Sequence, residues 1–276
     1  MVMGLAACGG NKAADPEPAP APAVSGAAES ALPAEAEDNS RKSEGDKFIV
    51  GFDAEYPPYG YMDDNGQYTG FDLELAQAIC ELTGWEYVPQ PIDWNSKDVA
   101  LNAGEIDCIW SGFTINGRED DYVWTVPYVN NSQVIVVGKD SGINSLADLA
   151  GKKVGVQAAS AAEGLLTDGD QAELGATFAE MPAFADYNTA FTELMAGALD
   201  ALAIDIGVAK YQTESRGEGF VILEEKLNEE EYGIGFKLGN YALRDQVEEA
   251  LYVLVSEGKY AELAEKYGLQ DFICLK

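Results

Sequence analysis

The sequence contains no histidine among its 276 residues, and arginine occurs only at Arg41, Arg118, Arg216 and Arg244. The absence of histidine removes the commonest metal ligand and the commonest general base of enzymes. Lysine and arginine number 17 against 48 acidic residues, which gives a formal net charge of −31 at pH 7. Because phosphate binding requires a basic face, this balance argues against nucleic acid or anionic lipid as a general partner. No metal or cofactor site is indicated.

Long apolar runs are also missing, since no stretch reaches the roughly 18 apolar residues of a membrane-spanning helix. The first residues instead contain Leu5-Ala6-Ala7-Cys8, which resembles the lipobox of bacterial lipoproteins, where cleavage precedes a lipidated cysteine. We therefore expect residues 1–8 to be a truncated signal that ends at the lipidation site Cys8. The alternative is a small-residue N-terminus with a stray cysteine.

Residues 9–45 are rich in proline, alanine and glutamate, as in the stretch "ADPEPAPAPAVSGAAES". Such a composition cannot build a core and predicts a disordered tether. An anchor and a tether before a globular part predict an extracytoplasmic protein that lipid holds to the cell membrane. The cysteines Cys80, Cys108 and Cys274 have no CxxC spacing, and buried free thiols are expected at the first two. One disulfide is possible, but the sequence does not choose its pair.

Strand-like and helix-like segments alternate from Lys47 onward. Strands are expected at residues 47–53, 86–93, 105–112, 132–138 and 152–157, and helices at 71–84, 97–104, 145–151, 160–166, 243–258 and 259–268. Repeated βα units predict a mostly parallel sheet with helices on both faces. The similar stretches "LNAGEID" and "LMAGALD" each indicate a helix end, a glycine stop and a new strand. Gly112 and Asp205 follow them at equal spacing, near the carboxyl ends of strands, where open α/β sheets bind ligands.

Four groups of residues suit the binding of a free amino acid. Its carboxylate requires a guanidinium and backbone N–H donors, which Arg118, behind Ser111, Gly112 and Thr114, could supply. The alternative for Arg118 is a solvated surface arginine, because three acidic residues follow it. Ser160 and Glu163 fit a capping box, whose free amides at Ala161 and Ala162 would attract an anion. The alternative is a helix cap alone.

The amino group of such a ligand requires a buried carboxylate, and Asp205 ends an apolar run. Its alternative role is to cap the next helix. Asp53, Tyr56 and Tyr59 follow the first strand, and Trp94 follows the second. These residues could wall a pocket with aromatic faces, or they could belong to a solvent-facing loop or the ordinary core.

The region from Lys47 to Lys276 resembles the extracytoplasmic solute-binding proteins of polar amino acid ABC transporters, bacterial family 3. The resemblance is carried by "YPPYGYMDDNGQYTGFDLELAQAI", "AGEIDCIWSGFTINGRE", "VWTVPYV", "SLADLAGKKVGVQ", "AGALDALAIDIGVAKY" and "YGIGFKLGN", in the family's order. It implies a two-lobed type II periplasmic-binding-protein (Venus-flytrap) fold of the α/β class, with two hinge strands. Lobe 1 would span residues 46–132, lobe 2 residues 133–232, and residues 233–276 would return to lobe 1.

The resemblance also implies a role for each candidate residue. The ligand carboxylate would be bound by Arg118, Gly112, Thr114, Ser160 and Ala161, its ammonium by Asp205, and its side chain by Asp53, Tyr56, Tyr59, Trp94 and Gln157. The spacing "TINGR" is one residue shorter than the family's usual pattern.

The implied function is capture of a polar amino acid and its delivery to an ABC permease by lobe closure. We expect a lipid-anchored monomer with no catalytic residue and no cofactor. Glutamine, a basic amino acid and cystine all remain open as solutes. The alternative function is that of a cyclic-carboxylate dehydratase on the same fold, in which Asp53 or Glu55 would act as acid or base. A ligand without an amino group would, however, leave Asp205 uncompensated.

Overall fold

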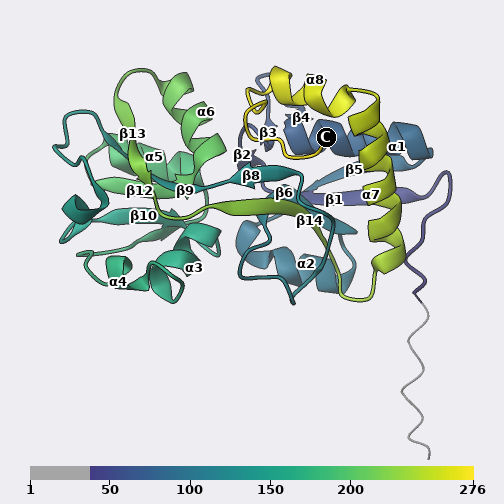
Figure 1. Cartoon of the computed structure of the whole chain (residues 1–276), viewed down its shortest axis with the longest axis horizontal. Coiled ribbons are helices and arrows are strands. Elements are labelled where there is room, and N and C mark those ends of the chain that lie inside the picture. Colours follow the sequence, from purple (N-terminus) through teal and green to yellow (C-terminus); the bar gives the residue numbers. More distant parts are fainter. Residues whose placement is uncertain (1–37) are drawn as a thin grey trace, which may run out of the picture. The chain divides into compact units, whose positions relative to one another are not determined.

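The structure, a computed structural model, describes residues 38–276, so that Cys8 and residues 9–37 of the expected tether lie outside the described part. In the described part the chain forms two α/β lobes, each with its own sheet (Figure 1). The expected α/β class and two-lobed architecture are confirmed.

Lobe 1 is built on a sheet with the strand order β5-β1-β6-β14-β7, in which β8 also pairs with β14. Its strands are β1 (Lys47–Phe52), β5 (Glu86–Pro91), β6 (Cys108–Thr114), β7 (Val123–Trp124), β8 (Val129–Asn131) and β14 (Glu230–Phe236). A small second sheet holds β2 (Glu55–Tyr56), β3 (Gly60–Met62) and β4 (Tyr68–Thr69). The helices are α1 (Phe71–Thr83), α2 (Lys97–Ala103), α7 (Tyr241–Ser256) and α8 (Lys259–Lys266), with one 3-10 turn, η1 (Trp94–Ser96).

The local sequence explains why the helices of lobe 1 end where they do. Leu75 and Ile79 recur at helical spacing on the buried side of α1. Gly84 ends α1 and Gly104 ends α2, both in the left-handed conformation, with φ of 74° and 76°. Glycine adopts this conformation without the steric cost of a side chain, and the chain then turns into the next strand.

Lobe 2 has the strand order β11-β10-β12-β9-β13. Its strands are β9 (Gln133–Gly138), β10 (Val154–Gln157), β11 (Ala183–Phe184), β12 (Ala201–Asp205) and β13 (Phe220–Lys226). Its helices are α3 (Ala161–Thr167), α4 (Ala172–Gly175), α5 (Tyr187–Met195) and α6 (Ile206–Arg216). The helix expected at residues 145–151 is only a 3-10 turn, η2 (Leu146–Leu149).

The chain crosses between the lobes twice, from β8 into β9 and from β13 into β14. A strand that enters a sheet from the other lobe needs no crossover helix, and here β9 and β14 run antiparallel to all their neighbours. All other strands of each lobe run in one direction, so the expected mostly parallel sheet forms with one antiparallel strand, β14 in lobe 1 and β9 in lobe 2. Because β14 joins the first sheet from Glu230, the second lobe limit falls before that residue and not at 232.

The core of lobe 1 continues into lobe 2. Tyr56 and Tyr59 of lobe 1 and Tyr187 and Ile204 of lobe 2 belong to one buried apolar cluster. The rings of Tyr56 and Tyr187 lie 6.1 Å apart across the boundary. The lobes therefore pack against each other in this structure, which is a closed arrangement.

The first described residues lie on α7 and close its N-terminus. Asp38 accepts a hydrogen bond from the Ala242 amide, and Ser40 accepts one from the Leu243 amide, so both satisfy first-turn N–H groups of this helix. The Lys42 amide donates to Gln246 at 2.9 Å. Residues 38–42 were expected to be part of the disordered tether, and the structure corrects this.

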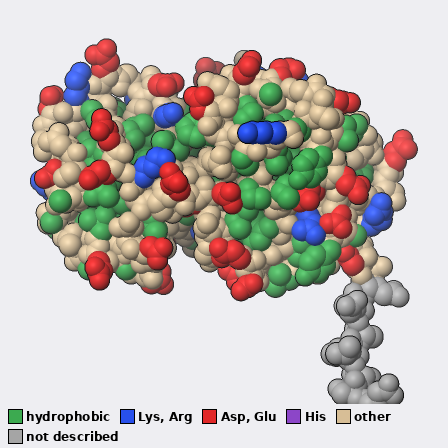
Figure 2. Space-filling view, viewed as in Figure 1, with side chains coloured by type: hydrophobic (Ala, Val, Ile, Leu, Met, Phe, Trp, Pro, Cys, Tyr) green, Lys and Arg blue, Asp and Glu red, His purple; other side chains and the backbone are tan. Residues whose placement is uncertain are grey.

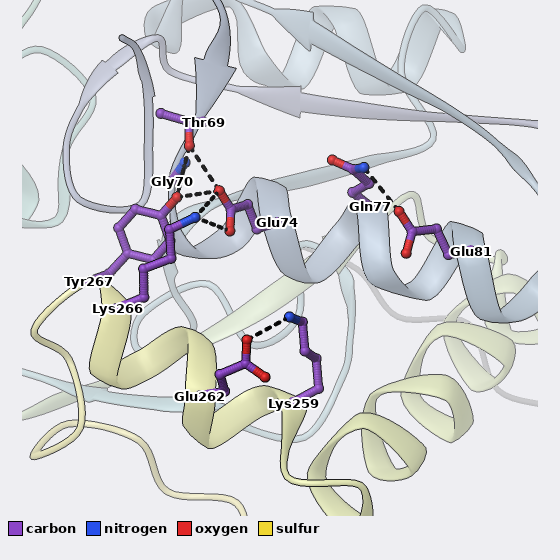
Figure 3. Close-up of polar contacts among 9 residues, drawn as sticks. All are labelled: Thr69, Gly70, Glu74, Gln77, Glu81, Lys259, Glu262, Lys266 and Tyr267. Carbon is purple, nitrogen blue, oxygen red and sulfur yellow. Dashed lines mark hydrogen bonds and ion pairs between the residues drawn. The ribbon is translucent and has the colours of Figure 1, made fainter.

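The C-terminal helix α8 is attached to α1 through one carboxylate (Figure 3). Glu74 accepts hydrogen bonds from Lys266 Nζ, 2.6 Å from both of its oxygens, and from Tyr267 Oη at 2.6 Å. The end of the chain is thus a structural part of lobe 1.

The surface of both lobes is predominantly acidic, with many more acidic than basic side chains on the face shown in Figure 2. Within residues 38–276, no helix has the length and apolar character needed to cross a membrane. Cys80 and Cys108 are buried free thiols, as expected, and Cys274 is a half-buried free thiol.

Candidate functional site

Residues from both lobes line one small cavity between them. Lobe 1 contributes Asp53, Tyr56, Trp94, Ser111, Gly112, Thr114 and Arg118, and lobe 2 contributes Gln157, Ser160, Ala161 and Asp205. The volume of the cavity is about 10 Å³, roughly the room that one water molecule needs. Of the residues to which the family resemblance assigns a ligand contact, all except Tyr59 line this cavity.

The strand ends explain why residues far apart in sequence meet at this point. Asp53 follows β1 directly, and Gly112 and Thr114 lie at the end of β6. On the other side, Gln157 ends β10 and Asp205 ends β12. The carboxyl ends of strands from both lobes thus converge on one cavity, where open α/β sheets bind ligands.

Arg118 bridges the two lobes at one end of the cavity. Its Nη1 donates to the carbonyl of Thr114 at 3.2 Å, and its Nη2 donates to the carbonyl of Ala159 in lobe 2 at 3.3 Å. Its guanidinium also lies 5.2 Å from the centre of the Phe113 ring. The alternative of a solvated surface arginine is therefore wrong.

Two residues with a positive φ, Gly117 and Ala159, shape the backbone around Arg118. Gly117 has a φ of 78° in a tight turn, in which the Arg118 amide donates to the carbonyl of Ile115. Ala159 has a φ of 56°, which lies in the left-handed region of backbone conformation that residues other than glycine rarely adopt. Such strain occurs mostly at functional sites, and here it belongs to the residue whose carbonyl accepts from Arg118.

The N-terminus of α3 lies beside Arg118. Ser160 caps the helix by accepting a hydrogen bond from the Glu163 amide at 3.1 Å. The Glu163 carboxylate accepts from the Ala159 amide at 2.6 Å, and not from the Ser160 amide, so only half of the expected capping box forms. Ala161 begins the helix, where first-turn amides have no partner within the helix, and it lines the cavity.

Asp205 also lines the cavity and is 3% exposed. It accepts hydrogen bonds from Asn131 Nδ2 at 2.6 Å, Gln133 Nε2 at 2.7 Å and Tyr232 Oη at 2.6 Å. It makes no side-chain cap to α6, so the alternative of a helix cap is wrong. Burial, together with the nearby charge of Glu230, raises the pKa of this carboxyl group above its usual range.

Asp53 marks a third region of the cavity. Its carboxylate accepts from Gln157 Nε2 of lobe 2 at 2.6 Å and from the Glu55 amide at 2.9 Å. Burial raises the pKa of Asp53 to about 6. Two aromatic side chains complete the walls: Tyr56 and Trp94, both buried.

Tyr59 is buried behind the cavity and does not line it. Its ring contacts Gly207 of lobe 2 so closely that a Cβ on this glycine would lie 2.4 Å from Tyr59 Oη. Tyr59 therefore contacts lobe 2 at Gly207, a position where any larger residue would clash with its ring.

Three further charged residues, not expected from the sequence, are buried near the site. Asp72 of α1 accepts a hydrogen bond from the Gly112 amide at 2.6 Å. Lys97 at the start of α2 is 4% exposed, its Nζ lies 5.1 Å from the centre of the Trp94 ring, and burial lowers its pKa. Glu230 is 4% exposed and accepts from Thr114 Oγ1 at 2.9 Å. Lys97 is hidden in an amphipathic helix and Glu230 in the acidic run "NEEEYG", so neither has a distinguishing signal in the sequence.

Residues 48–270 match the family described as "Bacterial extracellular solute-binding proteins, family 3". The chain belongs to this family. Among curated relatives, the chain is 32% identical to the arginine-binding extracellular protein ArtP of Bacillus subtilis over 226 residues, 80% of this chain and 86% of that protein. It is 28% identical to the L-cystine-binding protein TcyJ of Escherichia coli over 222 residues, 79% of this chain and 81% of that protein.

Solved structures of this family-3 protein's relatives share its fold. A substrate-binding protein of an ABC uptake transporter from Streptococcus pneumoniae with bound histidine aligns with a TM-score of 0.77 and 31% identity, covering 80% of this chain and 92% of that one. An ancestral arginine-binding protein bound to arginine aligns with a TM-score of 0.73 and 36% identity, covering 80% and 97%. An ancestral amino acid-binding protein described as a precursor of cyclohexadienyl dehydratase aligns at 0.73 and 31%, covering 80% and 95%.

Proposed function

We propose that this solute-binding protein captures a polar amino acid between its lobes and delivers it to an ABC permease. One observation carries the proposal: a guanidinium, Arg118, and a buried carboxylate, Asp205, line the same cavity from different lobes. An amino acid carries a carboxylate and an ammonium a few bonds apart, so it can pair with both at once. Membership of family 3 supports the same reading.

The carboxylate of the ligand would lie against Arg118. This side chain has five N–H donors, of which two contact carbonyl groups in the structure, and the others are available to a ligand. The Ala161 amide is the further contact that we assign to this end of the ligand. The Gly112 amide already donates to Asp72 Oδ2 at 2.6 Å, so it cannot also bind the carboxylate, and we withdraw the expected role of Gly112 at this end. Ser160 is assigned here through its place as the cap of α3.

The ammonium of the ligand would lie against Asp205 and Thr114. The Thr114 hydroxyl donates its single hydrogen to Glu230, so toward the cavity it can only accept a hydrogen bond. An ammonium can donate to it, whereas a carboxylate cannot. We therefore move Thr114 from the carboxylate end, where the sequence analysis put it, to the ammonium end.

The side chain of the ligand would lie between Tyr56 and Trp94, with its polar end at Asp53 and Gln157. The only hydrogen bonds that Asp53 accepts within the described residues come from an amide side chain and a backbone N–H. A cationic or amide group of the ligand would offset the cost of burying this carboxylate. This favours a basic amino acid or glutamine over an apolar one.

Capture requires the lobes to open, because a cavity of about 10 Å³ cannot admit an amino acid from solution. The bonds from Gln157 to Asp53 and from Arg118 to Ala159 join the lobes and would break on opening. We propose motion about the two crossings between the lobes, a hinge closure around the ligand.

We further propose that the protein acts outside the cytoplasm as a monomer attached to the membrane by lipid at Cys8, and that it performs no catalysis. A dehydratase would need a proton-transferring group in the cleft, for which Asp53 would serve. Its ligand would lack an ammonium, and Asp205 would then stay buried without a counter-charge. A protein that binds an amino acid without catalysis accounts for both Asp53 and Asp205.

The proposal is tested by a thermal-shift screen of the full chain, unfolded and refolded to remove any co-purified solute. Each amino acid and cystine is added separately. A ligand at about 100 times its Kd adds about 2.7 kcal/mol of stability and raises Tm by roughly 5–11 °C. A shift with one or two polar amino acids is expected. A shift only with carboxylates that lack an amino group would refute amino acid binding and favour the enzyme.

A further inference from the structure

Glu230, at the start of β14, is a buried carboxylate with no basic partner among the residues that the structure describes. Its Oε1 accepts from Thr114 Oγ1 at 2.9 Å, Asn131 Nδ2 at 2.6 Å and Gln133 Nε2 at 2.8 Å. Its Oε2 accepts from Asn228 Nδ2 at 3.0 Å. The donors are all neutral, so the negative charge of this group is hydrogen-bonded but not neutralised.

The same two amide nitrogens also serve Asp205. Asn131 Nδ2 lies 2.6 Å from Asp205 Oδ1, and Gln133 Nε2 lies 2.7 Å from that oxygen. Each amide therefore gives one N–H to each carboxylate, which holds the two carboxylates side by side at the hinge. The oxygens of both amides, Asn131 Oδ1 and Gln133 Oε1, are buried and have no hydrogen-bond partner in the described part of the chain.

Among residues 38–276, no lysine or arginine forms an ion pair with either carboxylate. Four buried tyrosines lie near the pair, and burial raises the pKa of each well above the usual range: Tyr56, Tyr59, Tyr187 and Tyr232. The charged residues of the cavity are Arg118 and Asp53, and those on the outer side of the hinge are Lys226, Glu229, Glu231 and Asp271. Two adjacent buried carboxylates cannot both ionise without a large cost. Burial and the charge of Glu230 raise the pKa of Asp205, so the proton lies on Asp205.

We infer that Glu230 is a positioning carboxylate whose charge keeps one proton on Asp205 until the ammonium of a ligand displaces that proton into solvent. This inference rests on the proposed function, because it requires a ligand with an ammonium. Before binding, the pair carries one negative charge. After binding, the two carboxylate charges are set against one ammonium charge, so the net charge is the same and one proton leaves for each ligand bound. Glu230 acts through Asn131, Gln133 and Thr114 and is therefore a positioning residue.

A consequence for selectivity is that the site rejects analogues whose nitrogen is acylated. Such a nitrogen carries no charge, so it cannot replace the proton on Asp205. A second consequence concerns pH. Because binding releases a proton, affinity falls as acid is added, by about tenfold per pH unit once the pair is protonated.

Isothermal titration calorimetry measures this proton directly. The full-length protein is titrated with L-arginine, L-histidine, L-glutamine and L-cystine between about pH 5 and pH 8. At each pH the titration is repeated in buffers that differ in ionisation enthalpy. The slope of binding enthalpy against that quantity gives the number of protons released. We expect release to approach about one proton per ligand at the acidic end and to vanish at the alkaline end.

The variant Glu230→Gln keeps the size of the side chain and removes the second carboxylate. It is expected to lose the proton release and to show a flatter dependence of affinity on pH. Glu231→Gln makes the same chemical change at an exposed neighbour and should behave as the wild type. Any titration of Asp53 is common to all three proteins, so it cancels in the comparison.

A second measurement needs no variant to fold. Infrared spectroscopy should show the carbonyl stretch of a protonated carboxyl group in the ligand-free wild type, and the band should disappear when ligand is added. Binding without proton release, or equal release in Glu230→Gln, would overturn the inference and leave the proposed function standing. Absence of binding by every amino acid in folded protein would overturn both.

Discussion

Replacing Arg118 by lysine tests the geometry of the carboxylate end while keeping its charge. In the structure this arginine contacts the carbonyls of Thr114 and Ala159 at 3.2 and 3.3 Å and still has three N–H donors. A lysine has three donors on a single nitrogen, so it cannot contact both carbonyls and both oxygens of a carboxylate. We expect the loss of one charge-assisted hydrogen bond, about 1.5–3 kcal/mol.

That loss corresponds to an increase in Kd of about 10- to 150-fold, which calorimetry with the ligand from the thermal-shift screen would measure. Arg244→Lys is the matched control, because Arg244 also donates to a carbonyl, that of Trp124, but does not line the cavity. An Arg118→Lys protein that binds as tightly as Arg244→Lys would refute the assignment of Arg118 to the ligand carboxylate.

Three further predictions concern the ammonium end, lobe closure and pH. Asp205→Asn should weaken binding by about 2–5 kcal/mol in calorimetry, because it leaves a buried ammonium unpaired, and an unchanged Kd would contradict the assignment. Gly207→Ala should weaken binding without lowering the unfolding temperature, since its Cβ would meet Tyr59 Oη at 2.4 Å only in the closed arrangement. Small-angle scattering should then show less compaction with ligand than in the wild type, and equal compaction would disprove the steric argument. Burial raises the pKa of Asp72 to about 7, above its unfolded value of 3.8, so the native state binds this proton more tightly. Stability should therefore decrease as pH rises from about 4 to 7, and urea titrations of Asp72→Asn should show a smaller decrease; identical slopes would exclude Asp72 as the cause.

Sequence patterns predict the positions at strand ends well. Gly112 and Asp205 each follow a helix, a glycine stop and a strand, and these local signals determine which sheet edge the residues occupy. Tyr59 shows the limit of this reasoning. It lies three residues after Tyr56, but the hairpin of β2 and β3 turns the chain between them, and its ring packs on Gly207 instead of the cavity.

Contacts between distant segments are the features that local patterns do not reveal. Asp38 and Ser40 have the polar, small character of a tether, yet they cap a helix more than 200 residues away. Glu230 stands in an acidic run, and only the pairing of β14 with β6 and β8 buries it beside Asp205. In both cases the determining partner is set by tertiary packing and not by the neighbouring sequence.

The two crossings between the lobes lie next to each other. Asn131 pairs with Glu230 in the first sheet, and the Leu227 amide donates to the carbonyl of Gln133 at 2.8 Å. Residues 133–226 therefore leave and re-enter lobe 1 at nearly one point, as an inserted domain does. Lobe 2 could be exchanged for that of a relative without a change in the chain connectivity of lobe 1. Since Asp205 would travel with the graft and Arg118 would stay, such chimeras would combine half-sites from different parents.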